Sequence, residues 1–211
     1  MTERDEALYR VVNLIVQRHV YSLPVDVEGL CRLYGATLLS YSEAVGRSLL
    51  SRDDIAGMAG TGDGFTLDAL DEWAIVYNDR VGRTRIRFTL AEELMHRLLL
   101  HSQDENFDLR AQSWTQETYA LYEAEAKRAA GMLLVPPTVY YRCRRSGDLS
   151  RLARLCAVSE ACVRRAAQDY DRNEDEIRAH FTHKHIACTL SDPAGKRGPR
   201  PVRAVGFLTG D

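Results

Sequence analysis

Apolar residues recur along most of this chain with the period of an α-helix, and along a few short segments with that of a strand. The clearest helical pattern lies in residues 5–20, where one face carries Leu8, Val11, Val12, Ile15 and Val16. The same spacing, together with capping and helix-breaking residues, predicts helices over residues 26–34, 115–134, 138–144, 149–155, 159–170 and 173–180. The pattern therefore predicts a mainly helical protein.

Short apolar runs bounded by turn residues indicate a small sheet. Residues 36–41 and 73–77 have the composition of strands, and residues 85–88 are expected to form a short extended piece. Residues 42–64 are ambiguous, because their glycines mark turns around weakly patterned segments. Together with the helices, these strands predict the α+β class, with a small sheet beside the helix that follows residue 88.

That helix carries ionisable side chains in its first turns, which is a poor way to build a plain core. Residues 87–96 read R-F-T-L-A-E-E-L-M-H. Glu92 and His96 are four apart and project from one helix face, and Glu93 lies close to it, whereas His101 lies off that face and is expected to be a structural histidine. The pattern differs in its first residue from H-E-x-x-H, in which two histidines hold zinc and the glutamate is a general base.

A metal on Glu92 and His96 needs a further protein ligand from another element, because a catalytic zinc site has three protein ligands and one position open to water. The next long helix offers Glu123 and Glu125, which are two apart and point to nearly opposite sides. Glu125 shares a side with Ala129 and is therefore preferred as the ligand, although periodicity favours it only slightly over Glu123.

These stretches resemble the hallmarks of the ImmA/IrrE metallo-endopeptidases. The motifs of that family look like R-F-T-L-A-H-E-L-G-H followed by L-x-L-H, and later E-A-x-x-F-A-A-x-L-L-M-P. This chain has R-F-T-L-A-E-E-L-M-H at residues 87–96, L-L-L-H at 98–101 and E-A-K-R-A-A-G-M-L-L-V-P at 125–136. Weaker likeness on both sides extends the resemblance over roughly residues 5–170.

The resemblance implies a mainly helical zincin-like fold and a zinc-dependent endopeptidase. The implied substrate is a protein, a helix-turn-helix transcriptional repressor of a phage, a mobile element or a stress response. Carried over by position, Glu93 is the general base, and His96 and Glu125 are metal ligands. Glu92 stands where the family has its first histidine ligand, and Met95 stands where it has a glycine.

Glu92 has two interpretations. Thr89 and Glu92 match the capping box T-x-x-E, in which the glutamate folds back to its own helix and contributes ~1 kcal/mol. Glu92 would then bind no metal, and the chain would be a catalytically inactive relative that binds a repressor or regulates one. If Glu92 is instead a ligand, two carboxylates and one imidazole form a harder donor set, which could favour Mn or Fe over Zn.

Composition argues against several other classes of protein. The formal net charge is −2 and the pI is near 6.3, so direct nucleic-acid binding is not expected.

No apolar run approaches the ~18 residues of a membrane span. The N-terminus is charged, without the apolar segment of a signal peptide. The five cysteines form no C-x-x-C. We therefore expect a cytoplasmic protein with reduced thiols.

The expected organisation has three parts. Residues 1–136 would form the zincin-like peptidase domain, and residues 137–186 a C-terminal helical subdomain packed on it. Residues 187–211 contain prolines, a basic run and few apolar anchors, so they are expected to form a flexible tail.

Overall fold

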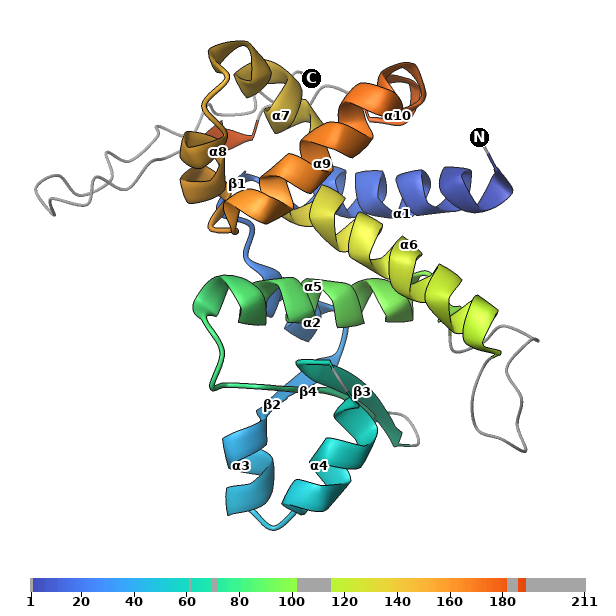
Figure 1. Ribbon diagram of the computed structural model, residues 1–211, viewed down its shortest axis with the longest axis vertical. Helices are drawn as coiled ribbons and strands as arrows, with labels where there is room; N and C mark the ends of the chain where they lie inside the picture. Colours follow the sequence, from blue (N-terminus) through green and yellow to red (C-terminus); the bar gives the residue numbers. More distant parts are fainter. Residues whose placement is uncertain (1, 61, 70–71, 102–114, 182–185, 189–211) are drawn as a thin grey trace, which may run out of the picture.

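The computed structural model describes residues 2–60, 62–69, 72–101, 115–181 and 186–188. Helices make up most of the structure, and a three-stranded sheet lies in its lower half (Figure 1). The predicted α+β class, mainly helical with a small sheet beside the central helix, is therefore confirmed.

The sheet has the order β2-β4-β3. Strand β4 (Glu72–Tyr77) lies in the middle, parallel to β2 (Ala36–Ser40) and antiparallel to β3 (Gly64–Ala69). The strands predicted at residues 36–41 and 73–77 are confirmed. The sequence pattern predicts no strand over β3, of which only Gly64 lies in the segment left ambiguous. Strand β3 forms one edge of the sheet, and no strand pairs with its outer side in the described part of the chain.

The central helix α5 (Arg83–Leu98) lies on one face of the sheet, and α6 (Gln116–Leu134) crosses α5 on the side away from the sheet (Figure 1). Helix α5 begins after Gly82, so the extended piece predicted at residues 85–88 is wrong. A long-range interaction explains the difference, because the Arg87 guanidinium donates hydrogen bonds from the helix to two backbone carbonyls of other segments, at 2.8 and 3.2 Å.

Because α5 begins several residues before Thr89, one of the two interpretations of Glu92 is excluded. The N-cap of α5 is Gly82, and Thr89 lies inside the helix, where its backbone amide is already hydrogen-bonded in the helical pattern. The capping-box interpretation of Thr89 and Glu92 is therefore wrong. The sequence T-x-x-E occurs here within a helix and not at its start.

The remaining N-terminal elements surround this centre. Helix α1 packs beside α6 above α5, α2 packs against α5, and α3 and α4 lie below the sheet (Figure 1). Their bounds are α1 Glu3–His19, β1 Ser22–Leu23, α2 Val27–Leu33, α3 Tyr41–Gly46 and α4 Arg52–Ala59. In the described residues, no helix combines the length and the apolar character that crossing a membrane requires.

The C-terminal helices pack on the upper side of the molecule (Figure 1). They are α7 Pro137–Cys143, the short 3-10 helix η2 Arg144–Ser146, α8 Leu149–Cys156, α9 Glu160–Arg172 and α10 Glu174–His180. One apolar core contains buried side chains from α1, α5 and α6 as well as from α7 to α10. The division into parts at residues 136 and 137 stays a prediction, and the core is continuous across it.

Only the beginning of the predicted tail lies within the described residues. Strand β5 (Ala187–Cys188) pairs with β1 as a two-stranded parallel sheet. Residues 189–211, the rest of the predicted flexible tail, lie outside the described residues.

Gly64 controls how closely β3 approaches α5. A Cβ atom at this position would overlap the Thr89 Cγ2 atom and would lie 3.1 Å from the Val76 carbonyl oxygen. We therefore expect Gly64→Ala to lower the free energy of unfolding by about 1–3 kcal/mol through overpacking, as measured by urea denaturation. Gly57→Ala in α4 is the control, because no atom lies within 4 Å of its Cβ position, and a helical alanine should stabilise. Equal stability of the two variants would contradict this account.

Candidate metal centre

Three side chains from two helices converge beside the middle of α5. Glu92 and His96 of α5 and Glu123 of α6 each offer one ligand atom, and these atoms lie within 4.8 Å of one another. His96 Nε2 is 3.3 Å from Glu123 Oε1. Glu92 is only 9% exposed, so its carboxylate is held in place by the packing of α5 against α6. This set of one imidazole and two carboxylates has the chemistry of a divalent-cation site.

The structure brings Glu123 into this group, whereas Glu125, which periodicity favoured, lies on another side of α6. Glu125 accepts hydrogen bonds from the Arg4 guanidinium at 2.7 and 2.9 Å, and its other contact is with His101. The two carboxylates do point apart, as their spacing predicted. Helical spacing gives no signal for Glu123, because Glu125 has equivalent spacings of four and seven to Ala129 and Met132, which are also buried.

Lys127 is a member of the cluster that sequence reasoning missed. Its Nζ atom is 3.5 Å from Glu92 Oε1 and also pairs with Glu123, one helical turn before it. The hydrogen bond from His96, and then that from Lys127, lowers the pKa of Glu123 to about 2. Burial raises the pKa of Glu92, which Lys127 partly counteracts. A bound divalent cation would therefore share these carboxylates with the lysine ammonium.

The Glu93 side chain points from α5 toward the sheet. Thr66 Oγ1 of β3 donates a hydrogen bond to Glu93 Oε2 at 2.9 Å. Burial raises the pKa of Glu93, and the charge of His96 and the Thr66 hydrogen bond offset this only in part. A carboxylate that is more basic than usual and fixed by a neighbouring hydroxyl is suited to accept a proton from a reactant.

These groups line one cleft between α5, α6 and β3. The cleft has a volume of about 610 Å³, and its walls include Thr66, Glu92, Glu93, His96 and Glu123. The candidate cation ligands and the candidate base are therefore open to the same space. That space is large enough for several side chains of a bound molecule.

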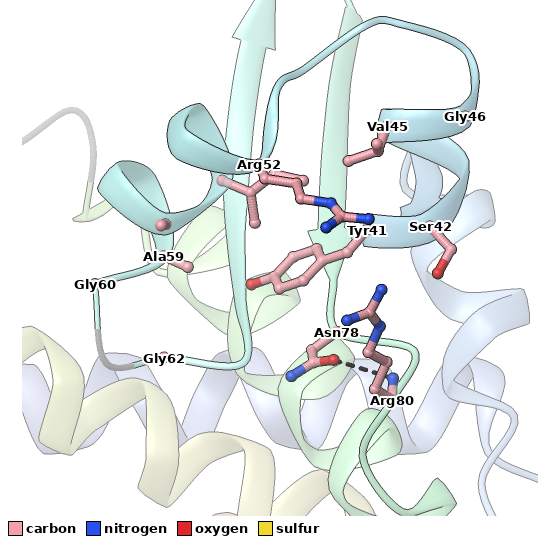
Figure 2. Close-up of a pocket in the computed structure, with 12 residues that line it drawn as sticks. Tyr41, Ser42, Val45, Gly46, Arg52, Ala59, Gly60, Gly62, Asn78 and Arg80 are labelled. Atoms are coloured by element: carbon pink, nitrogen blue, oxygen red, sulfur yellow. Dashed lines mark hydrogen bonds between the residues drawn. The ribbon is translucent and has the colours of Figure 1, made fainter.

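A second cavity, of about 570 Å³, lies between α3 and α4 on the far side of the sheet (Figure 2). Figure 2 shows the guanidinium groups of Arg52 and Arg80 beside the ring of Tyr41. Among the described residues that line this cavity, Arg52 and Arg80 are the charged ones. Gly60 and Gly62 line both this cavity and the cleft, so the two spaces adjoin.

The candidate centre lies within the part of the chain that a protein-family model matches. The model of a peptidase family, described as the IrrE N-terminal-like domain, matches residues 49–168, which include all of α5 and α6. A search of the curated proteins gives no match. Among solved structures, a Mycobacterium tuberculosis transcriptional regulator is similar, with 14% identity and a TM-score of 0.48. The match covers 75% of this chain and 45% of that one, so this chain spans less than half of that protein's length.

Lys127→Met tests whether the lysine and a divalent cation compete for the same carboxylates. Removing the ammonium leaves Glu92 and Glu123 without their nearby lysine partner, so we expect cation affinity to rise. The lysine side chain is 44% exposed, and solvent weakens its charge, so the expected gain is about tenfold, ~1.4 kcal/mol. Competition with a metal indicator measures it. Lys127→Arg keeps the charge and serves as the control, and weaker binding by Lys127→Met would contradict the assignment.

Proposed function

Because the chain belongs to the IrrE N-terminal-like domain family, a peptidase family, we propose that it is a metal-dependent endopeptidase. The metal ligands in this proposal are Glu92, His96 and Glu123. The observation that carries the proposal is the convergence of these three side chains with Glu93 in one cleft. Membership of the family supports the metallopeptidase-like activity, and the residues of this chain support the individual roles.

The donor set fits a divalent transition metal. Zinc accepts imidazole nitrogen and carboxylate oxygen, and three protein ligands leave a position for water. The second carboxylate, Glu92, makes the set harder than a two-histidine site, so manganese and iron are the alternatives to zinc. When bound, such a metal polarises a peptide carbonyl and makes its bound water more acidic.

Glu93 is the general base in the proposed reaction. Its carboxylate accepts a proton from the attacking water and later gives it to the amine that leaves, so the proton is conserved over the cycle. Its raised pKa suits a group that must take up and release one proton near neutral pH. The Thr66 hydroxyl donates a hydrogen bond to Oε2 of this carboxylate, and in the proposed reaction Oε1 takes up the proton from water.

The edge of strand β3 beside the cleft is suited to binding a protein substrate. Strand β3 lines the cleft with Gly64, Phe65 and Thr66, and one of its edges has no paired strand among the described residues. An extended peptide can pair with such an edge through backbone hydrogen bonds. We propose a helix-turn-helix repressor as the substrate, on the resemblance of the motifs, and the cytoplasm as the place of action.

A second candidate function is a metal-free module that binds a repressor without cleaving it. The observation that favours it is the ammonium of Lys127 beside Glu92 and Glu123, where it already supplies a positive charge. Metal analysis of the purified protein discriminates between the two functions. Absence of a bound transition metal after reconstitution with zinc, manganese and iron would favour the binding module.

Glu93→Gln tests the general base. The amide cannot take up the proton, so we expect cleavage of a co-expressed candidate repressor to slow by about 10²–10⁴-fold. Metal content should stay at the level of the unchanged protein, because Glu93 is not a ligand in this proposal. Glu72→Gln, at an exposed position of β4, removes the same charge elsewhere and should cleave normally. Cleavage that survives in Glu93→Gln would exclude this role.

Glu92→His tests the identity of the metal. The change restores H-E-x-x-H and makes the donor set softer, so we expect affinity for zinc to rise relative to manganese, on the order of tenfold. Competition titrations with both metals measure the ratio. Glu92→Gln removes the charge without adding a nitrogen donor, and it should weaken the binding of both metals. An unchanged ratio in Glu92→His would argue against residue 92 as a ligand.

A further inference from the structure

The cavity between α3 and α4 lies outside the cleft that holds the proposed metal ligands. Its volume of about 570 Å³ falls within the range of small-molecule sites, roughly 300–1,000 Å³. Apolar side chains, among them Val45 and Ile55, line it together with the charged side chains of Arg52 and Arg80. Apolar walls with a few polar groups are typical of a site for a small molecule.

Two arginines reach this cavity from different segments. Arg52 begins α4, where the Ser51 side chain caps the helix. Arg80 follows β4, and its backbone amide donates a hydrogen bond to Asn78 Oδ1 at 3.0 Å (Figure 2). Both guanidinium groups lie beside the Tyr41 ring (Figure 2). Among the described residues, no carboxylate forms an ion pair with either guanidinium, so both are available to an anion.

Tyr41 gives a second, independent indication of a ligand. Its ring lines the cavity, and its hydroxyl is buried without a hydrogen-bond partner among the described residues. Figure 2 shows the hydroxyl on the side of the ring toward Ala59. Burial raises the pKa of Tyr41, and the charges of Asp63 and Glu93 raise it further, so the hydroxyl keeps its proton. A buried donor without an acceptor is unfavourable, and a neutral acceptor on a bound molecule would satisfy it.

We propose that this cavity binds a small organic anion, a molecule with an apolar body and one carboxylate or phosphate group. The body packs on the Tyr41 ring and on the apolar side chains of α3 and α4. The anionic group accepts hydrogen bonds from Arg52 and Arg80, because the paired N–H groups of a guanidinium fit carboxylate and phosphate alike. The site does not depend on the proposed function, although Gly60 and Gly62 line both this cavity and the cleft.

The class of ligand is tested by titrating the ¹⁵N-labelled full-length chain, free of metal, and following its ¹H–¹⁵N spectra. Benzoate and phenyl phosphate combine an apolar ring with an anionic group, whereas acetate and inorganic phosphate supply only the anion and benzyl alcohol only the ring. We expect saturable shifts at the Arg52 and Arg80 Nε–H groups and at Gly60, with at least tenfold tighter binding of one combined probe than of its separate parts. Equal binding of the anion alone, or no saturable shift, would overturn the proposal.

An acidic side chain of a polypeptide carries the same carboxylate, so one arm of the titration uses an acetylated and amidated tripeptide with a central glutamate. A free small molecule as the ligand predicts weaker binding of this peptide than of benzoate. Tighter binding of the peptide would overturn the assignment to a small molecule.

Substitutions test the residues. Arg52→Gln and Arg80→Gln should each weaken binding of the tighter combined probe by about tenfold, and Arg80→Lys, which keeps the charge without the paired donors, should lie between. Both arginines are exposed, so folding should be retained, which thermal unfolding checks. Arg164→Gln in α9 removes the same charge elsewhere and is the matched control. Unchanged binding in Arg52→Gln and Arg80→Gln would overturn the site.

The Tyr41 hydroxyl is tested with a matched pair of probes. 4-Acetylbenzoate adds a carbonyl acceptor to benzoate, and a hydrogen bond from Tyr41 should make it bind about threefold more tightly. Tyr41→Phe keeps the ring and should lose only this gain. An equal gain in Tyr41→Phe would exclude the hydroxyl from the site.

Discussion

The site depends on the position of α5 between the sheet and α6. A helix covered on two sides must bury side chains in both directions, and in α5 these include the adjacent carboxylates Glu92 and Glu93. Consecutive residues on a helix point about 100° apart, so one carboxylate meets α6 and the other meets β3. Burial raises the pKa of both, and each has a different partner: Lys127 for Glu92 and Thr66 for Glu93. One helix thus supplies a candidate ligand and a candidate base to one cleft, each with its own surroundings.

The sequence predicted the type of most elements, because helical spacing and short apolar runs are local properties. It failed where a distant partner decided the local structure. Residues 85–88 have the composition of a short strand, but Arg87 donates hydrogen bonds to the carbonyls of Val25 and Ala157, from segments far away in the sequence. These contacts favour a helix that begins at Arg83. The capping-box interpretation of Glu92 depended on a helix that began at Thr89, and it failed for the same reason.

The choice between Glu123 and Glu125 could not be made from one helix, because both carboxylates have a histidine partner. His96 and His101 both reach α6, and each meets a different carboxylate: His96 meets Glu123 and His101 meets Glu125. Periodicity shows that the two glutamates point apart, but not which of them faces His96. That depends on the rotation of α6 about its axis, which is fixed by packing against α1 and α5 together. The sequence could therefore give the candidate residues, while their pairing required the tertiary structure.

The glutamate at position 92 and the lysine at position 127 are best understood as one feature. A histidine ligand at position 92 would be neutral, whereas Glu92 adds a negative charge in a place that is 9% exposed. Such a charge is unfavourable unless a cation lies beside it. Lys127 lies one helical turn after Glu123 and reaches Glu92 across the contact between the helices, so its ammonium offsets the charge that Glu92 adds. With both residues present, the local charge is the same as with a neutral ligand and no lysine. A divalent cation would then bind to a site with the same net charge as one that has a neutral histidine at position 92, but with an oxygen donor in place of a nitrogen donor. The departure from H-E-x-x-H therefore changes the hardness of the donor set more than its net charge.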